Sequence, residues 1–286
     1  MNHFCPLCQN LREVQLWRNY RHLVQCRVCK LKFVPTKKQE NHEFYRQPEN
    51  SPFTYYSQNK AASEKNADEL FGIYEKLLRR NSEDEVFEPI VKGSKILDVG
   101  CSAGAFLQKA RANGAVGTGI EINADCVNFC VNDLNLNVKK QSVEEAEFES
   151  HSFDLVNLGD VIEHLVQPLH ALKKIFGWLK PGGFLTICTP DLRSIGTRIF
   201  QIKPDEHLLY FTEKTLSKLL KKSDFEVIFC SNFDPWRDLD SLKYSTTFRR
   251  YPFALKILDL ATKTLGKDEL LFRLPLRENL IMVGRK

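Results

Sequence analysis

A short apolar run that leads into a glycine-containing loop constrains the fold of this chain more than any other feature. The segment 95–99, Lys-Ile-Leu-Asp-Val, leads into Gly100-Cys101-Ser102-Ala103-Gly104, and helical character follows over 105–113 until Gly114. Glycines let the backbone approach a ligand closely, and a helix N-terminus offers free N–H groups and a positive dipole end. We therefore expect a buried strand, a ligand-binding loop and a helix in succession.

Strand and helix signals alternate beyond this loop, a pattern typical of a parallel sheet covered by helices. The predicted strands are 95–99, 116–120, 138–141, 153–158, 184–188, 225–230 and 280–283. The predicted helices are 60–80, 105–113, 124–134, a helix from Pro168 to the Pro181-Gly182-Gly183 turn, and one that Thr212 caps and that extends to Lys222. The expected fold class is α/β, a Rossmann-like seven-stranded sheet with helices on both faces.

The loop and the next strand indicate which cofactor is bound. Glu121 ends the second predicted strand, where a carboxylate can accept both ribose hydroxyls. In the dinucleotide fingerprint G-x-G-x-x-G the second glycine admits a pyrophosphate, but here Ser102 and Ala105 stand at the second and third glycine positions. Asp98 also places a negative charge where a phosphate would be repelled and an amino group attracted. The pattern therefore disfavours a dinucleotide.

Four motifs in order over about 90 residues resemble those of class I S-adenosylmethionine-dependent methyltransferases. The segment 96–104 resembles their first motif, usually D-x-G-x-G-x-G, and Gly119-Ile120-Glu121 resembles their second-strand acid. Residues 153–164 look like the fourth-strand motif, and 179–183 like the turn before strand five. The departure is Ser102, a small residue at the middle glycine.

The resemblance implies a role for each matched position. Asp98 and Gly100 would face the methionine part of S-adenosylmethionine, Glu121 the ribose, Ser142 and Val143 the adenine, and Asp160 the methionine end. A structural role at a strand end is the alternative for the acids, and for Ser142 and Val143 that alternative stays open. The implied cofactor-binding set is Asp98, Gly100, Cys101, Ser102, Gly104, Glu121, Ile122, Ser142, Val143, Gly159 and Asp160.

Two Cys-x-x-Cys pairs near the start of the chain have the spacing of a four-thiolate zinc site. Cys5 and Cys8 form the first pair, and 17 residues separate it from the second pair, Cys26 and Cys29. The segment is too short to bury a core, so metal binding would supply its folding free energy. Four thiolates close the coordination shell, which indicates structural zinc, with a redox pair as the alternative.

A loop at the carboxyl edge of the expected sheet, 204–212, concentrates titratable groups before a helix. His207 has a suitable unperturbed pKa for a general base, and Glu206 could orient it. The alternative is a histidine bonded to backbone. With the four cysteines, the Glu206-His207 pair resembles methyltransferases that modify sugars, in some of which a His beside a Glu acts as the base. The resemblance implies a sugar or nucleotide-linked sugar as acceptor, methylated at carbon or oxygen.

Charge is distributed unevenly along the chain. Residues 1–46 carry a net charge of +6, residues 47–235 carry −6, and residues 236–286 carry +5. Basic ends can simply be solvated surface, or they can meet an anionic acceptor. The second hypothesis is therefore an RNA methyltransferase whose basic zinc module holds nucleic acid, although no Asn-Pro-Pro-Tyr motif or aromatic-basic stripe supports it. A scaffold with a degenerate pocket is the third, disfavoured by the intact Asp98 and Glu121.

The expected organisation is a zinc-binding module at 1–34, a linker at 35–59 and a methyltransferase domain at 60–286. That domain holds an insertion, 236–277, before the last strand, with an amphipathic stretch at 253–265. The apolar runs are too short to cross a bilayer, and the N-terminus has no signal-peptide pattern, so a cytoplasmic protein is expected. The oligomeric state stays open.

Overall fold

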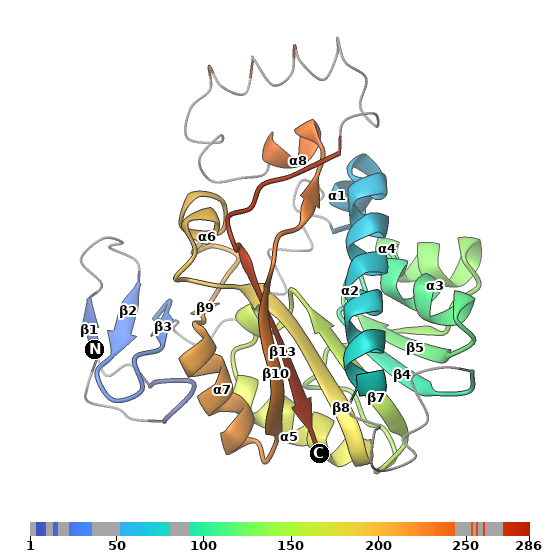
Figure 1. Cartoon of the computed structure of the whole chain (residues 1–286), viewed down its shortest axis with the longest axis horizontal. Helices are drawn as coiled ribbons and strands as arrows, with labels where there is room; N and C mark the ends of the chain where they lie inside the picture. The colour runs from blue at the N-terminus through green and yellow to red at the C-terminus, as the bar shows by residue number, and fades with distance from the viewer. Residues whose placement is uncertain are drawn as a thin grey trace.

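The computed structural model describes residues 4–9, 14–16, 23–35, 52–80, 92–243, 253, 256, 260 and 271–286. Its centre is a seven-stranded sheet in the order β10-β13-β8-β7-β4-β5-β6, which Figure 1 shows nearly edge-on between its helices. The paired strands are parallel except β13, which runs antiparallel to β8 and β10. The strands are β4 (Lys95–Val99), β5 (Val116–Glu121), β6 (Val138–Lys140), β7 (Phe153–Gly159), β8 (Leu179–Pro190), β10 (Glu226–Phe233) and β13 (Asn279–Arg285).

Helices cover both faces of this sheet and divide its core in two. Successive side chains of a strand point to opposite faces, and β4 follows this rule. Leu97 joins the core beneath α5 (Pro168–Trp178) and α7 (Glu213–Lys222), whereas Ile96 joins the core beneath α2 (Lys60–Arg80) and α3 (Ala105–Ala112). The expected α/β Rossmann-like fold is therefore confirmed, and all seven predicted strands are present.

Several elements differ from the sequence-based expectation. β8 begins at Leu179 and ends at Pro190, so the glycine turn expected before it is part of the extended strand. The predicted helix 124–134 divides into α4 (Ala124–Asn128) and one π-helical turn, η3 (Phe129–Asp133). Three short elements were not expected: α1 (Pro52–Gln58) from the segment predicted as a linker, η4 (Ile162–His164) and α6 (Ile195–Phe200).

The segment that carries the cysteine pairs forms most of a second, four-stranded sheet, β1-β2-β3-β9, in which Cys26 ends β2. Its first three strands come from the N-terminal segment: β1 (Val14–Leu16), β2 (Val24–Cys26) and β3 (Lys32–Phe33). The fourth, β9 (Leu209–Tyr210), comes from the loop that carries His207. Lys32 pairs with Tyr210 and Phe33 with Leu209, and the backbone N–H of Val34 donates to the carbonyl of Leu208 at 2.8 Å. The cysteine segment is thus joined to the candidate site.

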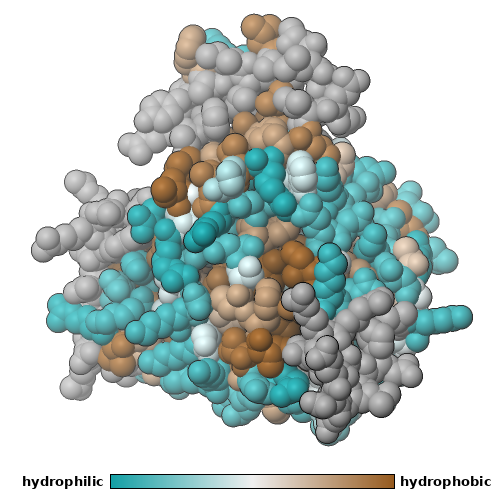
Figure 2. Space-filling view, viewed as in Figure 1, coloured by the Kyte–Doolittle hydropathy of each residue, from teal (hydrophilic) through white to brown (hydrophobic). Residues whose placement is uncertain are grey.

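Apart from residues 253, 256 and 260, the predicted insertion, 236–277, is described only at its two ends. It contributes β11 (Trp236–Arg237), which pairs with β12 (Phe272–Arg273), and α8 (Leu239–Lys243). Most of the amphipathic stretch 253–265, and residues 36–51 of the predicted linker, lie outside the described residues. Figure 2 shows a mostly hydrophilic face, with hydrophobic side chains near α6, where Ile195 and Ile199 are exposed. In the part of the chain that the structure describes, no helix is long and apolar enough to span a membrane.

Candidate active site

The loop after β4 takes a conformation that only small residues fit. Gly100 has a φ of 67°, and a Cβ there would lie 2.5 Å from Cγ2 of Val161. Gly104 has a φ of 80°, and a Cβ there would lie 2.6 Å from Cδ1 of Leu136. Side chains at these two positions would both strain the backbone and clash. The loop therefore requires glycine at Gly100 and Gly104, as the resemblance implies.

Ser102, the departure from the family pattern, occupies the same left-handed region. Its φ is 48°, and it is half-buried. This conformation is unfavourable for residues other than glycine, and a bonded neighbour is needed to hold it. The backbone N–H of Ser102 donates to Oε2 of Glu121 at 2.9 Å. Serine at the middle position therefore takes a left-handed backbone conformation of the kind that favours glycine.

Glu121 is held by backbone N–H groups at the end of β5. Its Oε1 accepts from the N–H of Ile122 at 2.7 Å and from that of Asn123 at 2.8 Å, besides the bond from Ser102. Burial raises the pKa of Glu121, while these three N–H donors act in the opposite direction. A carboxylate offers about four lone-pair sites, so the three N–H bonds leave room for about one ribose hydroxyl rather than the expected two.

Asp98 lies inside the sheet, 3% exposed, at the carboxyl end of β4. Its Oδ1 accepts from Nδ2 of Asn157 at 2.8 Å, and the Asn157 amide oxygen in turn accepts from Oγ1 of Thr186 at 2.9 Å. Burial raises the pKa of Asp98 to about 7, the Asn157 amide lowers it, and the Glu121 carboxylate raises it. A cation beside Asp98 would restore its negative charge. Asn157 is a site residue that the sequence reasoning missed.

The other predicted cofactor positions follow β6 and β7. Ser142 is buried and its hydroxyl accepts from the backbone N–H of Glu145 at 3.2 Å, while Val143 is buried. A Cβ added at Gly159 would make only an ordinary van der Waals contact, 3.7 Å from Nδ2 of Asn157. Asp160 has a φ of 52° and is exposed, although the protein atoms packed around its carboxyl and the Glu278 carboxylate raise its pKa to about 6. Cys101 is buried and Ile122 half-buried.

The structure brings the four N-terminal cysteine sulfurs together. The Sγ atoms of Cys5 and Cys29 are 3.4 Å apart, as are those of Cys8 and Cys26, and all four lie within 4.8 Å of one another. All four are free thiols. Zn–S bonds of about 2.3 Å in a tetrahedron separate sulfurs by roughly 3.8 Å. The cluster therefore has the size of a tetrahedral thiolate site.

The two cysteine turns have the same backbone form, which supports a metal fit. Gln9, directly after Cys8, has a φ of 60°, and Lys30, directly after Cys29, has a φ of 68°. In each turn the N–H of this residue donates to the carbonyl of the first cysteine, at 2.8 Å for Gln9 and 3.0 Å for Lys30. The N–H of Cys29 also points to Sγ of Cys26 at 3.5 Å. The residues fit a structural zinc ion, which they would hold through four thiolates.

His207 is buried and its ring is oriented by backbone. Its Nδ1 lies 2.9 Å from the carbonyl oxygen of Gln201, whereas the Glu206 carboxylate binds Nζ of Lys203 at 3.2 Å. The expected orienting residue, Glu206, is thus replaced at Nδ1 by a main-chain oxygen. Burial lowers the pKa of His207 well below its usual value, and the neighbouring His164 and Lys203 lower it further. The ring is therefore neutral, and a lone pair is available on Nε2.

His164 lies beside His207, and a buried glutamate binds Gln201, the residue whose carbonyl His207 contacts. The His164 ring lies 4.9 Å from the His207 ring, and Nδ1 of His164 is 2.8 Å from the carbonyl of Glu206. Burial lowers the pKa of His164 to about 4. Glu278, 1% exposed, binds Nε2 of Gln201 at 2.7 Å and pairs with Arg237. These residues come from four separate segments of the chain, so no local sequence pattern predicts that they lie close together.

Comparisons with known proteins agree with this geometry. Residues 67–228, more than half of the chain, match the model of a family described as "Methyltransferase domain". A ubiquinone biosynthesis O-methyltransferase of Coxiella burnetii is 29% identical over 104 residues, which cover 35% of this chain and 44% of the relative. The match therefore spans less than half the length of that relative.

Solved structures share the fold at low sequence identity. Phosphoethanolamine N-methyltransferase 2 of Haemonchus contortus, in complex with S-adenosylmethionine, superposes with a TM-score of 0.52 at 15% identity, covering 88% of this chain and 61% of that one. A methyltransferase dependent on S-adenosylmethionine from Archaeoglobus fulgidus gives 0.50 at 20% identity, covering 75% and 94%.

Proposed function

The chain belongs to the methyltransferase domain family, and from this premise we propose that it transfers a methyl group from S-adenosylmethionine to a small hydroxylated acceptor, most consistent with a sugar or nucleotide-linked sugar. The observation that carries the proposal is the pairing of Asp98 and Glu121 around the strained loop 100–104. The buried Asp98 carboxyl suits an ammonium group, and the buried Glu121 carboxyl suits a ribose hydroxyl. The match to an O-methyltransferase of ubiquinone biosynthesis supports a hydroxylated acceptor.

The residues of the chain would bind, orient and accept a proton. The bound cofactor supplies an electrophilic methyl group on a sulfonium. Asp98 would hold the amino group of the methionine part, and Glu121 a ribose hydroxyl. Nε2 of the neutral His207 ring would accept a proton from the acceptor, because Nδ1 is occupied by the Gln201 carbonyl. A positioned base of this kind contributes roughly 10²–10⁴-fold to the rate.

Labelled cofactor and a panel of acceptors test the proposal. We expect transfer to at least one nucleotide-linked sugar or hydroxylated quinone precursor, with His207→Gln reducing kcat by roughly 10²-fold or more and leaving the cofactor Kd unchanged. His170→Gln, an exposed histidine on α5, is the matched control and should keep wild-type turnover. Absence of cofactor binding to the wild-type protein would contradict the proposal, and near-full turnover of His207→Gln would remove the base.

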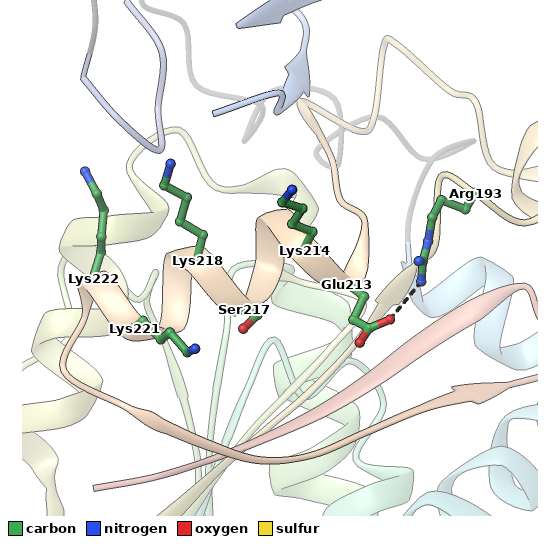
Figure 3. A pocket seen from close by; sticks show the side chains of 7 residues that line it. All are labelled: Arg193, Glu213, Lys214, Ser217, Lys218, Lys221 and Lys222. Carbon is green, nitrogen blue, oxygen red and sulfur yellow. Dashed lines mark hydrogen bonds and ion pairs between the residues drawn. The ribbon is translucent and has the colours of Figure 1, made fainter. Parts of the chain in front are cut away.

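A row of lysines supports the alternative of a nucleic-acid acceptor. A pocket of about 600 Å³ beside α7 is lined by Arg193, Glu213, Lys214, Ser217, Lys218, Lys221 and Lys222. In Figure 3, Lys214, Lys218 and Lys222 point the same way from one face of α7, as spacings of four residues dictate. RNA binding that weakens steeply with salt, and that the substitution Lys218→Glu reduces, would favour this alternative. Salt-insensitive turnover of a small acceptor would exclude it.

A further inference from the structure

Two histidines and a glutamate converge close to Asp160. Glu163 and His164 belong to η4, which follows β7, and His207 belongs to the loop before β9. One ligand atom from each of the three residues lies within 4.8 Å of the other two. Metal–nitrogen and metal–oxygen bonds of about 2.0–2.2 Å place ligand atoms at most about 4.3 Å apart. An inward shift of under about 1 Å would bring all three onto one ion.

Glu163 carries the strongest sign that something is missing from this cluster. Its side chain is 1% exposed, and its Oε2 accepts from Oγ1 of Thr189 at 2.9 Å. Its other oxygen, Oε1, is fully buried and has no hydrogen-bond partner within the described residues. A buried carboxylate oxygen without a partner is unfavourable, so such groups are usually bonded or coordinate a cation.

The two imidazoles are oriented as metal ligands usually are. Nδ1 of His164 lies against the carbonyl of Glu206, and Nδ1 of His207 against that of Gln201. Because a carbonyl oxygen only accepts, each Nδ1 carries the hydrogen, and the lone pair of a neutral ring lies on Nε2. In metalloproteins, a histidine that binds the metal through one ring nitrogen usually donates a hydrogen bond from the other ring N–H, often to a backbone carbonyl, and this bond fixes the orientation of the ring.

We propose that Glu163, His164 and His207 bind a divalent first-row transition-metal ion through one carboxylate oxygen and two imidazole nitrogens. Two histidines and one carboxylate suit such ions and leave coordination positions open, unlike the four thiolates of the cysteine cluster. The inference rests on the proposed function in one respect: an acceptor oxygen would take an open position. With the ion bound, Nε2 of His207 would be a ligand and could not accept the acceptor's proton. The ion would instead lower the pKa of the acceptor hydroxyl, whose proton would pass to solvent.

Cobalt tests the site separately from the cysteine cluster. The full chain is loaded with one equivalent of zinc, which four thiolates hold in preference, and then titrated with Co²⁺. We expect one further equivalent to bind, with weak visible absorption and without the intense thiolate-to-cobalt band. Glu163→Gln and His164→Gln should each weaken Co²⁺ binding by about 10-fold or more, whereas His170→Gln should bind like the wild type. Equal binding by all three variants, or none by the wild type, would overturn the proposal.

Cofactor affinity separates the failure of this inference from that of the proposed function. Glu163→Gln should keep the S-adenosylmethionine Kd of the wild type, which shows that the variant is folded. Transfer activity that is independent of added metal, in a protein that binds no Co²⁺, would overturn the metal site and leave the proposed function standing. Specific Co²⁺ binding by a protein that does not bind S-adenosylmethionine would overturn the proposed function and leave the metal site standing.

Discussion

Asp98 is a buried carboxyl whose ionisation depends on what lies beside it. Burial raises its pKa to about 7, against a usual value near 3.8. Between these two values the folded protein binds more protons at Asp98 than the unfolded chain does, so the contribution of this group to stability falls as pH rises through that window. An ammonium group bound nearby would favour the ionised form. Cofactor binding should therefore release a proton from Asp98 below about pH 7.

The pH dependence of cofactor affinity tests this coupling. For the wild type we expect the S-adenosylmethionine Kd to be about tenfold weaker at pH 6 than at pH 8, because a proton must leave Asp98 at the lower pH. Asp98→Asn keeps the size and the contact with Asn157 but cannot ionise, so its Kd should change by less than about twofold over that range. Calorimetry at both pH values measures this. A variant with the wild-type pH profile would assign the titration to another group.

At the scale of single residues, the sequence predicts roles best where a strand fixes the position. Asp98 and Glu121 each end or nearly end a strand, and the structure brings both to the loop 100–104. The partner of His207 was not predictable, because Glu206 and Gln201 are both near it in sequence and only the course of the chain decides between them. Glu163 was visible only as part of a motif, since nothing in the sequence shows that His207 folds onto it.

The elements that sequence patterns missed are those stabilised by distant partners. β4 and β7 are largely buried on both faces and read as apolar runs, so their ends were predicted to within one residue, as were those of β5. β3 and β9 are two residues long and have no periodicity of their own. β3 pairs with β2 as well as with β9, and β9 pairs with β3, which is far from it in the sequence. The same pairing joins the cysteine segment to the loop of His207, and the N–H of Leu208 donates to the carbonyl of Glu163 at 2.9 Å.

Removal of metal from the cysteine cluster should therefore destabilise β9. Without the ion the cysteine segment loses its main source of folding free energy, and β9 loses its partner strand. We expect chelation to accelerate amide hydrogen exchange at residues 208–210 by about tenfold or more, with no change in β4. Mass spectrometry of exchange in metal-loaded and stripped protein checks this. Unchanged exchange at 208–210 would show that β9 is stable without the cysteine segment.

At the scale of the whole molecule, cofactor binding and the fold are linked by mass action. A ligand that binds only the folded state at about 100 times its Kd adds about 2.7 kcal/mol to the free energy of unfolding. Gly100→Ala should abolish this increment, because its Cβ would meet Val161. Gly72→Ala is the matched control: Gly72 lies in α2, where an added Cβ would meet nothing within 4 Å, and the variant should gain about 0.5–1 kcal/mol.

Urea denaturation with and without S-adenosylmethionine measures both variants. Gly72→Ala should keep the full ligand-dependent increase, while Gly100→Ala should show none. If S-adenosylmethionine raised the free energy of unfolding of Gly100→Ala as much as that of the wild type, the cofactor would not approach this loop.

The pairing of β3 with β9 also has a consequence for how the chain is made. Lys32 pairs with Tyr210, which is 178 positions further along. At about 5–20 residues per second, synthesis of that interval takes roughly 10–35 s. Throughout that time the nascent cysteine segment can bind its metal ion, but one edge of β3 stays unpaired. An unpaired strand edge is prone to pair with the strands of other chains. A ribosome that stalls before residue 209 would release a product with this edge still open.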